Sequence, residues 1–137
     1  MFVLDASIAM AWCFEDEATS ATRGLLDRLS IEGGYVPGIW PIEVANVLTL
    51  AERRRRITPA DSAEFIGMLE GLSILVDEGT TTRAFGRVLD LAREAGLTAY
   101  DAAYLELSMR LGVPLATKDG PLGDAARRLG VTVVGAD

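Results

Sequence analysis

Histidine is absent from this 137-residue sequence, and cysteine occurs once. The single cysteine, Cys13, excludes an internal disulfide and a cysteine-based zinc site. No GxGxxG or P-loop pattern occurs, so nucleotide binding through those loops has no support. The longest apolar runs are far too short to span a bilayer, and no membrane association is expected.

A secretory signal peptide is not predicted either. Residues 1–14 are apolar, but they lack a positively charged start and contain Asp5. Together with a single free cysteine, this favours a reducing cytoplasm. Half of the chain is hydrophobic and only 24% is charged, so we expect one folded domain rather than disorder. The high apolar content suggests that a second copy or a bound peptide covers part of the surface.

The charge balance is acidic, with a formal net charge of −7. This argues against a protein that binds nucleic acid through charge alone, but not against an enzyme whose acids hold cations. Twelve of the thirteen basic residues are arginine, and four of them are consecutive: Arg53, Arg54, Arg55 and Arg56. This run has two interpretations, a solvated helix end or a surface for phosphate or an acidic partner.

Short apolar segments alternate with longer segments of helical periodicity. Strands are predicted at residues 2–4, 35–36, 74–76, 114–116 and 131–134, and helices at residues 7–14, 17–29, 42–55, 59–72, 82–95, 98–112 and 122–129. The helix over 82–95 should place Phe85, Val88 and Leu89 on one face. This alternation predicts an α/β fold with a mostly parallel central sheet flanked by helices.

Four acids follow predicted strands or begin predicted helices: Asp5, Glu43, Asp101 and Asp119. Each has a local explanation: an N-cap for Asp5, a helix-dipole contact for Glu43, a capping box with Thr98 for Asp101, and a turn for Asp119. In a parallel α/β fold, however, these positions converge at the carboxyl ends of the strands. The four acids together therefore predict one carboxylate pocket.

A pocket of carboxylates needs a cation, because two such charges 4 Å apart repel by about 4 kcal/mol at an effective dielectric of 20. Oxygen ligands without histidine or thiolate favour Mg²⁺ or Mn²⁺ over zinc. Three polar neighbours could assist: Ser7 could cap the first helix and free Asp5, Asn46 shares the face of Glu43, and Thr117 could orient Asp119 or a water. Asp124 lies inside a helix and is expected to face solvent.

Four segments resemble the motifs of PIN-domain nucleases: residues 3–7 (VLDAS), 41–46 (PIEVAN), 100–104 (YDAAY) and 116–119 (ATKD). The resemblance extends over essentially the whole chain and is strongest to the VapC toxins of toxin–antitoxin pairs. It implies one PIN-like nuclease domain over residues 1–137, a metal-dependent endoribonuclease, a homodimer, and an antitoxin whose tail occludes the active-site groove.

The resemblance also implies roles for individual residues. Asp5, Glu43 and Asp101 would hold the main Mg²⁺ or Mn²⁺, and Asp119 would complete the site or hold a second metal or a water. Ser7, Asn46 and Thr117 would be the supporting polar groups. The hypothesis for the reaction is in-line attack of water on an RNA phosphodiester, leaving a 5′-phosphate.

Rival classes explain fewer of these residues. A receiver-like magnesium-binding phosphotransfer domain needs adjacent acids after the first strand, but Ala6 follows Asp5, and Asp77 is the only acceptor candidate. A haloacid-dehalogenase-type phosphatase needs aspartates two apart, and position 7 is serine. A non-catalytic RNA- or protein-binding module with a relict acidic pocket remains an alternative.

Four aromatic residues lie near the acids in the sequence: Trp12, Trp40, Tyr100 and Tyr104. Aromatic rings beside a nuclease site can stack on the bases of a single-stranded substrate. Packing in the core is the competing interpretation, and Trp12 in particular is expected to be a core residue.

Overall fold

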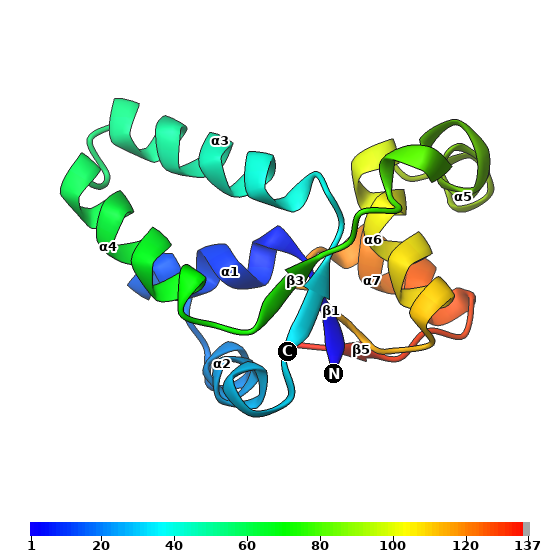
Figure 1. Ribbon diagram of the computed structural model, residues 1–137, viewed down its shortest axis with the longest axis horizontal. Helices are drawn as coiled ribbons and strands as arrows, with labels where there is room; N and C mark the ends of the chain where they lie inside the picture. The colour runs from blue at the N-terminus through cyan, green and yellow to red at the C-terminus, as the bar shows by residue number, and fades with distance from the viewer. Residues whose placement is uncertain (136–137) are drawn as a thin grey trace.

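Five short parallel strands form the centre of the computed structural model, which describes residues 1–135 (Figure 1). The sheet order is β3-β2-β1-β4-β5, and every strand pair is parallel. The strands are β1 (Phe2–Leu4), β2 (Gly34–Val36), β3 (Ile74–Val76), β4 (Leu115–Ala116) and β5 (Val133–Val134). The predicted α/β fold with a mostly parallel sheet is confirmed.

The sheet is built around β1, whose three residues are completely buried. β1 is continuously apolar because helices cover both faces of a parallel sheet, so neither face needs polar side chains. β2 and β4 flank it. The carboxyl ends of these three central strands therefore lie side by side.

Helices connect the strands and cover the sheet (Figure 1). They are α1 (Ala6–Cys13), α2 (Ser20–Glu32), α3 (Trp40–Arg53), α4 (Pro59–Glu70), α5 (Leu89–Ala95), α6 (Ala99–Leu111) and α7 (Gly120–Arg128). The 3₁₀ turns η1 (Glu15–Glu17) and η2 (Thr81–Arg83) and the π-helical turn η3 (Ala84–Val88) complete the connections. In the view of Figure 1, α3 and α4 project to one side of the sheet, and α5, α6 and α7 lie on the other.

The helix starts follow the predicted local chemistry. Thr58 and Asp61 form a complete capping box at the start of α4, and the Thr98 hydroxyl accepts the Asp101 N–H at the start of α6. Within residues 1–135, no helix has both the length and the apolar character needed to cross a membrane. The prediction of a single domain over 1–137 stays a prediction, and its last two residues lie outside the described residues.

The prediction of a continuous helix over residues 82–95 is wrong. The segment is divided into η2, η3 and α5, and Gly86 has a non-helical backbone conformation (φ −106°, ψ −105°). Gly86 lacks a Cβ and so tolerates this conformation, which turns Phe85 away from the face shared with Val88. Phe85 is 95% exposed, whereas Val88 is buried.

Candidate functional site

The four predicted acids lie on elements that begin or end at the same edge of the sheet. Asp5 directly follows β1, and Asp119 follows β4, the neighbouring strand. Glu43 lies in the first turn of α3, the helix that follows β2, and Asp101 lies in the first turn of α6. Their charges interact, because those of Asp119, Asp5 and Glu43 all raise the pKa of Asp101. The structure therefore places the four carboxylates at one edge of the sheet, where the charges of the other three act on Asp101.

Asp5 is the most buried of the four, with 6% of its surface exposed. Its Oδ2 accepts hydrogen bonds from Ser7 Oγ and Thr117 Oγ1, both at 2.7 Å. The two hydroxyls in turn accept the backbone N–H groups of Lys118 (3.0 Å) and Asp119 (2.9 Å). Burial raises the pKa of Asp5, and the two hydroxyl hydrogen bonds offset part of that rise. This network fixes one carboxylate oxygen and ties β1 to the loop after β4.

The predicted capping role of Ser7 is wrong. Helix α1 begins at Ala6, one residue earlier than predicted, so Asp5 has the N-cap position and Ser7 lies inside the first turn. The Asp5 side chain makes no capping hydrogen bond to α1, because both hydroxyls converge on it instead. The N-cap explanation therefore accounts for the position of Asp5 but not for its carboxylate.

Glu43 is half-buried and accepts a hydrogen bond from the phenol hydroxyl of Tyr104 on α6. Burial raises the pKa of Glu43, the Tyr104 hydrogen bond lowers it, and the charge of Asp5 raises it further. Asn46, one turn later on α3, is exposed, and its side chain makes no hydrogen bond within residues 1–135. Its supporting role stays a prediction.

Asp101 leaves its half of the expected capping box unused. The Thr98 hydroxyl accepts the Asp101 N–H at 3.1 Å, but among the described residues the Asp101 carboxylate accepts no hydrogen bond from the Thr98 N–H. Burial, followed by repulsion from Asp119, Asp5 and Glu43, raises the pKa of Asp101 to about 6. The local explanation thus accounts for Thr98, whereas the carboxylate of Asp101 faces other acids.

Asp119 combines a structural contact with its place among the acids. Its Oδ1 accepts the Leu122 N–H at 2.8 Å and caps α7, which begins at Gly120 rather than at the predicted Leu122. Its charge still raises the pKa of both Asp5 and Asp101. Asp124, one turn into α7, is exposed and pairs with Arg127 at 3.5 Å, as expected for a solvent-facing residue.

Among the described residues, no basic side chain neutralises these four acids. Within residues 1–135 the ion pairs involve other carboxylates, and none includes Asp5, Glu43, Asp101 or Asp119. The protein donors that reach the four side chains are hydroxyl and backbone N–H groups, which carry no charge. A positively charged ligand could therefore bind at the site and neutralise its negative charge.

The donor set fits a hydrated Mg²⁺ or Mn²⁺ ion. In the part of the chain that the structure describes, no three acidic or thiol side chains are already grouped as ligands of one ion. Mg²⁺ keeps several of its waters and is often bound by only one or two carboxylates, so it does not require such a preformed cage. Partly buried, mutually repelling oxygen donors without histidine suit this ion and not zinc.

Asp77, the acceptor candidate of the receiver-like alternative, lies outside this site. It pairs with Arg110 at 2.7 Å and accepts a hydrogen bond from Thr80 at 3.0 Å. Both contacts lower the pKa of Asp77 and occupy its carboxylate oxygens. Asp77 thus has a structural role between β3 and α6, which disfavours phosphotransfer.

The arginine run does not form one continuous helix surface. Helix α3 ends at Arg53, and Arg55 adopts a left-handed conformation (φ 57°). Arg56 pairs with Asp16 (2.7 Å) and Glu17 (3.1 Å) of η1 and lies over the Phe14 ring. Arg56 therefore anchors η1 to the end of α3, while the side chains of Arg53, Arg54 and Arg55 are exposed.

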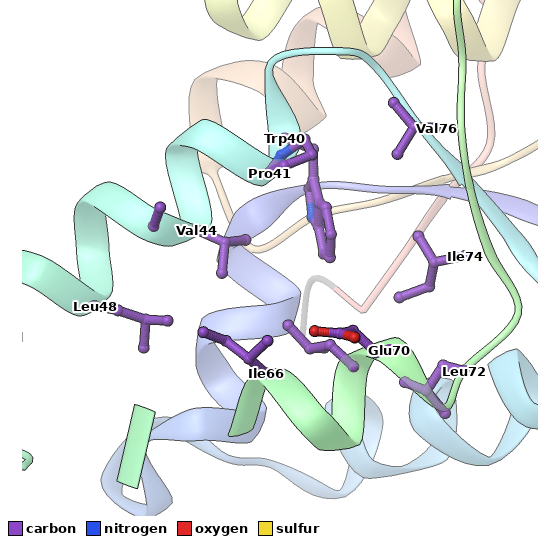
Figure 2. A pocket seen from close by; sticks show the side chains of 11 residues that line it. Trp40, Pro41, Val44, Leu48, Ile66, Glu70, Leu72, Ile74 and Val76 are labelled. Carbon is purple, nitrogen blue, oxygen red and sulfur yellow. The ribbon is translucent and has the colours of Figure 1, made fainter. Parts of the chain in front are cut away.

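An apolar groove of about 330 Å³ lies between α3, α4 and β3 (Figure 2). Its lining includes Trp40, Val44 and Leu48 on the α3 side and Ile66 on α4. Trp40 projects into the groove in Figure 2, and among residues 1–135 its buried indole N–H has no hydrogen-bond acceptor. The four acids do not line this groove, although Glu43 is on the same helix.

The aromatic residues divide between core and surface. Tyr104 is completely buried and Trp40 nearly so, which excludes both from stacking on a base, whereas Tyr100, beside Asp101, is 62% exposed. The hydrogen bond from Tyr104 to Glu43 was not predicted. The available signal was the spacing of Tyr104, which is three residues after Asp101 and so lies on the same side of a helix.

Comparisons with known proteins identify similar sequences and folds. The family model described as PIN domain matches residues 2–128. VapC ribonuclease Mb0985 of Mycobacterium bovis and ribonuclease VapC9 of Mycobacterium tuberculosis are each 30% identical over 135 residues, which cover 98% of both chains.

Solved structures share the fold at lower identity. PAE2754 from Pyrobaculum aerophilum is 24% identical with a TM-score of 0.70, and the match covers 96% of this chain and 82% of that one. FitAcB from Neisseria gonorrhoeae is 19% identical with a TM-score of 0.67, and the match covers 99% and 98% of the two chains.

Proposed function

This chain belongs to the PIN-domain family, and on that premise we propose that it is an endoribonuclease, the toxin of a VapC-type toxin–antitoxin pair. We further propose that it depends on Mg²⁺ or Mn²⁺, acts in the cytoplasm and functions as a homodimer. The observation that carries the proposal is the group of four carboxylates at one edge of the sheet, none of them neutralised by a basic side chain within residues 1–135.

Asp5, Glu43 and Asp101 would hold the ion, and Asp119 would complete the site. A bound Mg²⁺ or Mn²⁺ supplies an activated water and stabilises charge on the phosphate and the leaving oxygen. The hydroxyls of Ser7 and Thr117 hold Asp5 Oδ2, so that the carboxylate needs no reorientation during the reaction. A site of this kind requires no histidine base, in agreement with the composition.

To reach the site, RNA would have to approach a protein that is acidic overall. The exposed ring of Tyr100 adjoins Asp101 and is suited to stack on a base near the cleaved bond. The exposed Arg53, Arg54 and Arg55 at the end of α3 would contact either RNA phosphates or acidic residues of the antitoxin.

The groove between α3 and α4 is the surface we propose for the antitoxin. It is mostly apolar, with Glu70 as a charged residue in its lining, and it is next to the exposed edge strand β3. Its Trp40 indole N–H has no acceptor among the described residues. An apolar peptide segment with a backbone carbonyl near Trp40 would fill the groove and satisfy that donor. Its position beside the start of α3 would bring the peptide close to Glu43.

Cleavage of labelled total RNA, including tRNA, tests the function directly. Purified protein is incubated in Mg²⁺, Mn²⁺ or EDTA, with Asp101→Asn as the matched variant. We expect metal-dependent products with 5′-phosphate ends, and none from the variant. Metal-dependent cleavage retained by Asp101→Asn would refute the assignment of the site, and RNA binding without cleavage in any metal would favour the non-catalytic module.

A further inference from the structure

Tyr104 connects two of the elements that carry the acidic site. It lies one turn after Asp101 on α6, its side chain is completely buried, and its hydroxyl donates to Glu43 Oε1 on α3. The two residues are 61 positions apart in the sequence. Helix α3 packs against α1, and in Figure 1 it extends away from α6. The phenol is therefore a side-chain link between helices that diverge from the site.

The contact leaves the other oxygen of Glu43 available. Within residues 1–135, Glu43 Oε2 has no hydrogen-bond partner, and no ion pair reaches the carboxylate. The same arrangement exists at Asp5, where Ser7 and Thr117 both donate to Oδ2 and, among residues 1–135, no side chain donates to Oδ1. In each carboxylate, one oxygen accepts the side-chain hydrogen bonds found in the described part of the chain, and the other accepts none of them.

The chemical nature of the donor is important here. A lysine or arginine that donated to Glu43 from position 104 would cancel the charge that attracts a cation. A phenol donates a hydrogen bond and adds no charge. The rigid, buried ring has few conformations, so its hydroxyl defines where the Glu43 carboxylate can lie.

We propose that Tyr104 is a positioning residue for metal binding, which holds the Glu43 carboxylate in the orientation that an incoming divalent cation requires. The inference rests on the proposed metal-dependent function. Residues that orient metal ligands typically change metal affinity on the order of 10-fold to 100-fold when they are replaced. Tyr104 acts through Glu43 and does not touch the substrate, since it has no exposed surface.

The test is the affinity for Mn²⁺, measured from the free-ion signal in electron paramagnetic resonance and so independent of cleavage. Tyr104→Phe keeps the buried ring and removes only the hydroxyl. We expect its dissociation constant for Mn²⁺ to rise on the order of tenfold. The cleavage rate of this variant should recover at saturating metal, because the catalytic carboxylates are unchanged. Tyr35→Phe is the matched control, since Tyr35 is partly buried on β2 and its hydroxyl has no hydrogen bond within the described residues.

A double-mutant cycle with Glu43→Gln separates positioning from packing. If Tyr104 acts through the Glu43 carboxylate, Tyr104→Phe should weaken Mn²⁺ binding in the wild-type background and change it little in Glu43→Gln. An equal effect in both backgrounds, or none in the wild type, would overturn the role of Tyr104 while leaving the nuclease function intact. A wild-type protein that binds no Mn²⁺ would refute the metal-dependent function, and the role of Tyr104 with it.

Discussion

At the scale of single residues, the acids of this protein differ in what balances their charge. Asp77 and Glu106 are paired with Arg110, and their contacts hold β3 and α6 in place. Within residues 1–135, Asp5 and Glu43 accept hydrogen bonds from side-chain hydroxyl groups and form no ion pair with a basic side chain. Paired acids stabilise the fold. Unpaired, partly buried acids lower the stability of the folded protein, and a bound cation restores it.

Asp101 should therefore make the stability of the metal-free protein depend on pH. Burial and the neighbouring acids raise its pKa from 3.8 to about 6, so the folded state binds the proton more tightly than the unfolded state. The free energy of unfolding should consequently fall as pH rises from about 4 to about 7. The full difference corresponds to about 3 kcal/mol, which solvent screening at this partly exposed carboxylate reduces to about 1 kcal/mol.

Denaturant unfolding in EDTA between pH 5 and pH 8 measures this effect. Asp101→Asn removes the charge, so we expect a smaller loss of stability with pH and a more stable protein at neutral pH, even though the same variant is expected to be inactive. Asp124→Asn, an exposed aspartate on α7, should behave like the wild type. A variant of Asp101 that is less stable than the wild type at neutral pH would contradict the repulsion among the acids.

At the scale of elements, the α3–α4 pair forms a surface that the rest of the fold does not cover. Ile66 on α4 is 40% exposed at the groove, and Trp40 and Val44 on α3 lie beneath its opening. Burying this apolar lining against a peptide removes it from water, at about 25 cal/mol for each Å². A second carboxylate in the groove, beside Glu70, would oppose that burial.

Ile66→Glu should weaken antitoxin binding on the order of tenfold or more, because the partner would have to bury a carboxylate or leave the groove. Isothermal titration calorimetry with the purified antitoxin measures the affinity. Ile31→Glu, which changes an exposed isoleucine on α2 outside the groove, is the control. Ile66→Glu should retain metal-dependent cleavage, since Ile66 does not contact the acids. Unchanged antitoxin affinity in Ile66→Glu would place the partner elsewhere.

At the scale of the whole molecule, a net charge of −7 opposes association with RNA. The acidic edge of the sheet adds to this repulsion at the proposed site of cleavage, unless a divalent cation reverses the local field. RNA binding by this protein should therefore require the metal, in contrast to basic proteins, whose affinity only falls when salt is added.

Fluorescence anisotropy with a non-cleavable 2′-O-methyl RNA tests this expectation. We expect binding in millimolar Mg²⁺ or Mn²⁺ and at least a tenfold weaker affinity in EDTA, with KCl added to equal ionic strength as the control. Equal affinity in EDTA and Mg²⁺ would show that basic residues, such as those at the end of α3, dominate RNA binding.

The homodimer remains a prediction, which a light-scattering mass of twice 14.6 kDa would support.

The sequence by itself determined the alternation of strands and helices and the parallel α/β class, and it predicted four acids at one edge of the sheet. These follow from local periodicity, helix caps and the rule that parallel strands end at the same edge. The tertiary structure decided which groups surround each carboxylate. The hydrogen bonds from Thr117 to Asp5 and from Tyr104 to Glu43 join residues 112 and 61 positions apart, and no local pattern encodes such a pair.

The tertiary structure also decided the departures from the local patterns. Gly86 interrupts an apolar helical repeat and exposes Phe85. Helix α1 begins one residue earlier than predicted, at Ala6, and the Asp5 carboxylate binds two hydroxyls and does not cap the helix. Local propensities are small compared with the packing and hydrogen bonding of distant segments. For that reason the sequence predicted where the site lies, and only the folded chain defined how its carboxylates are held.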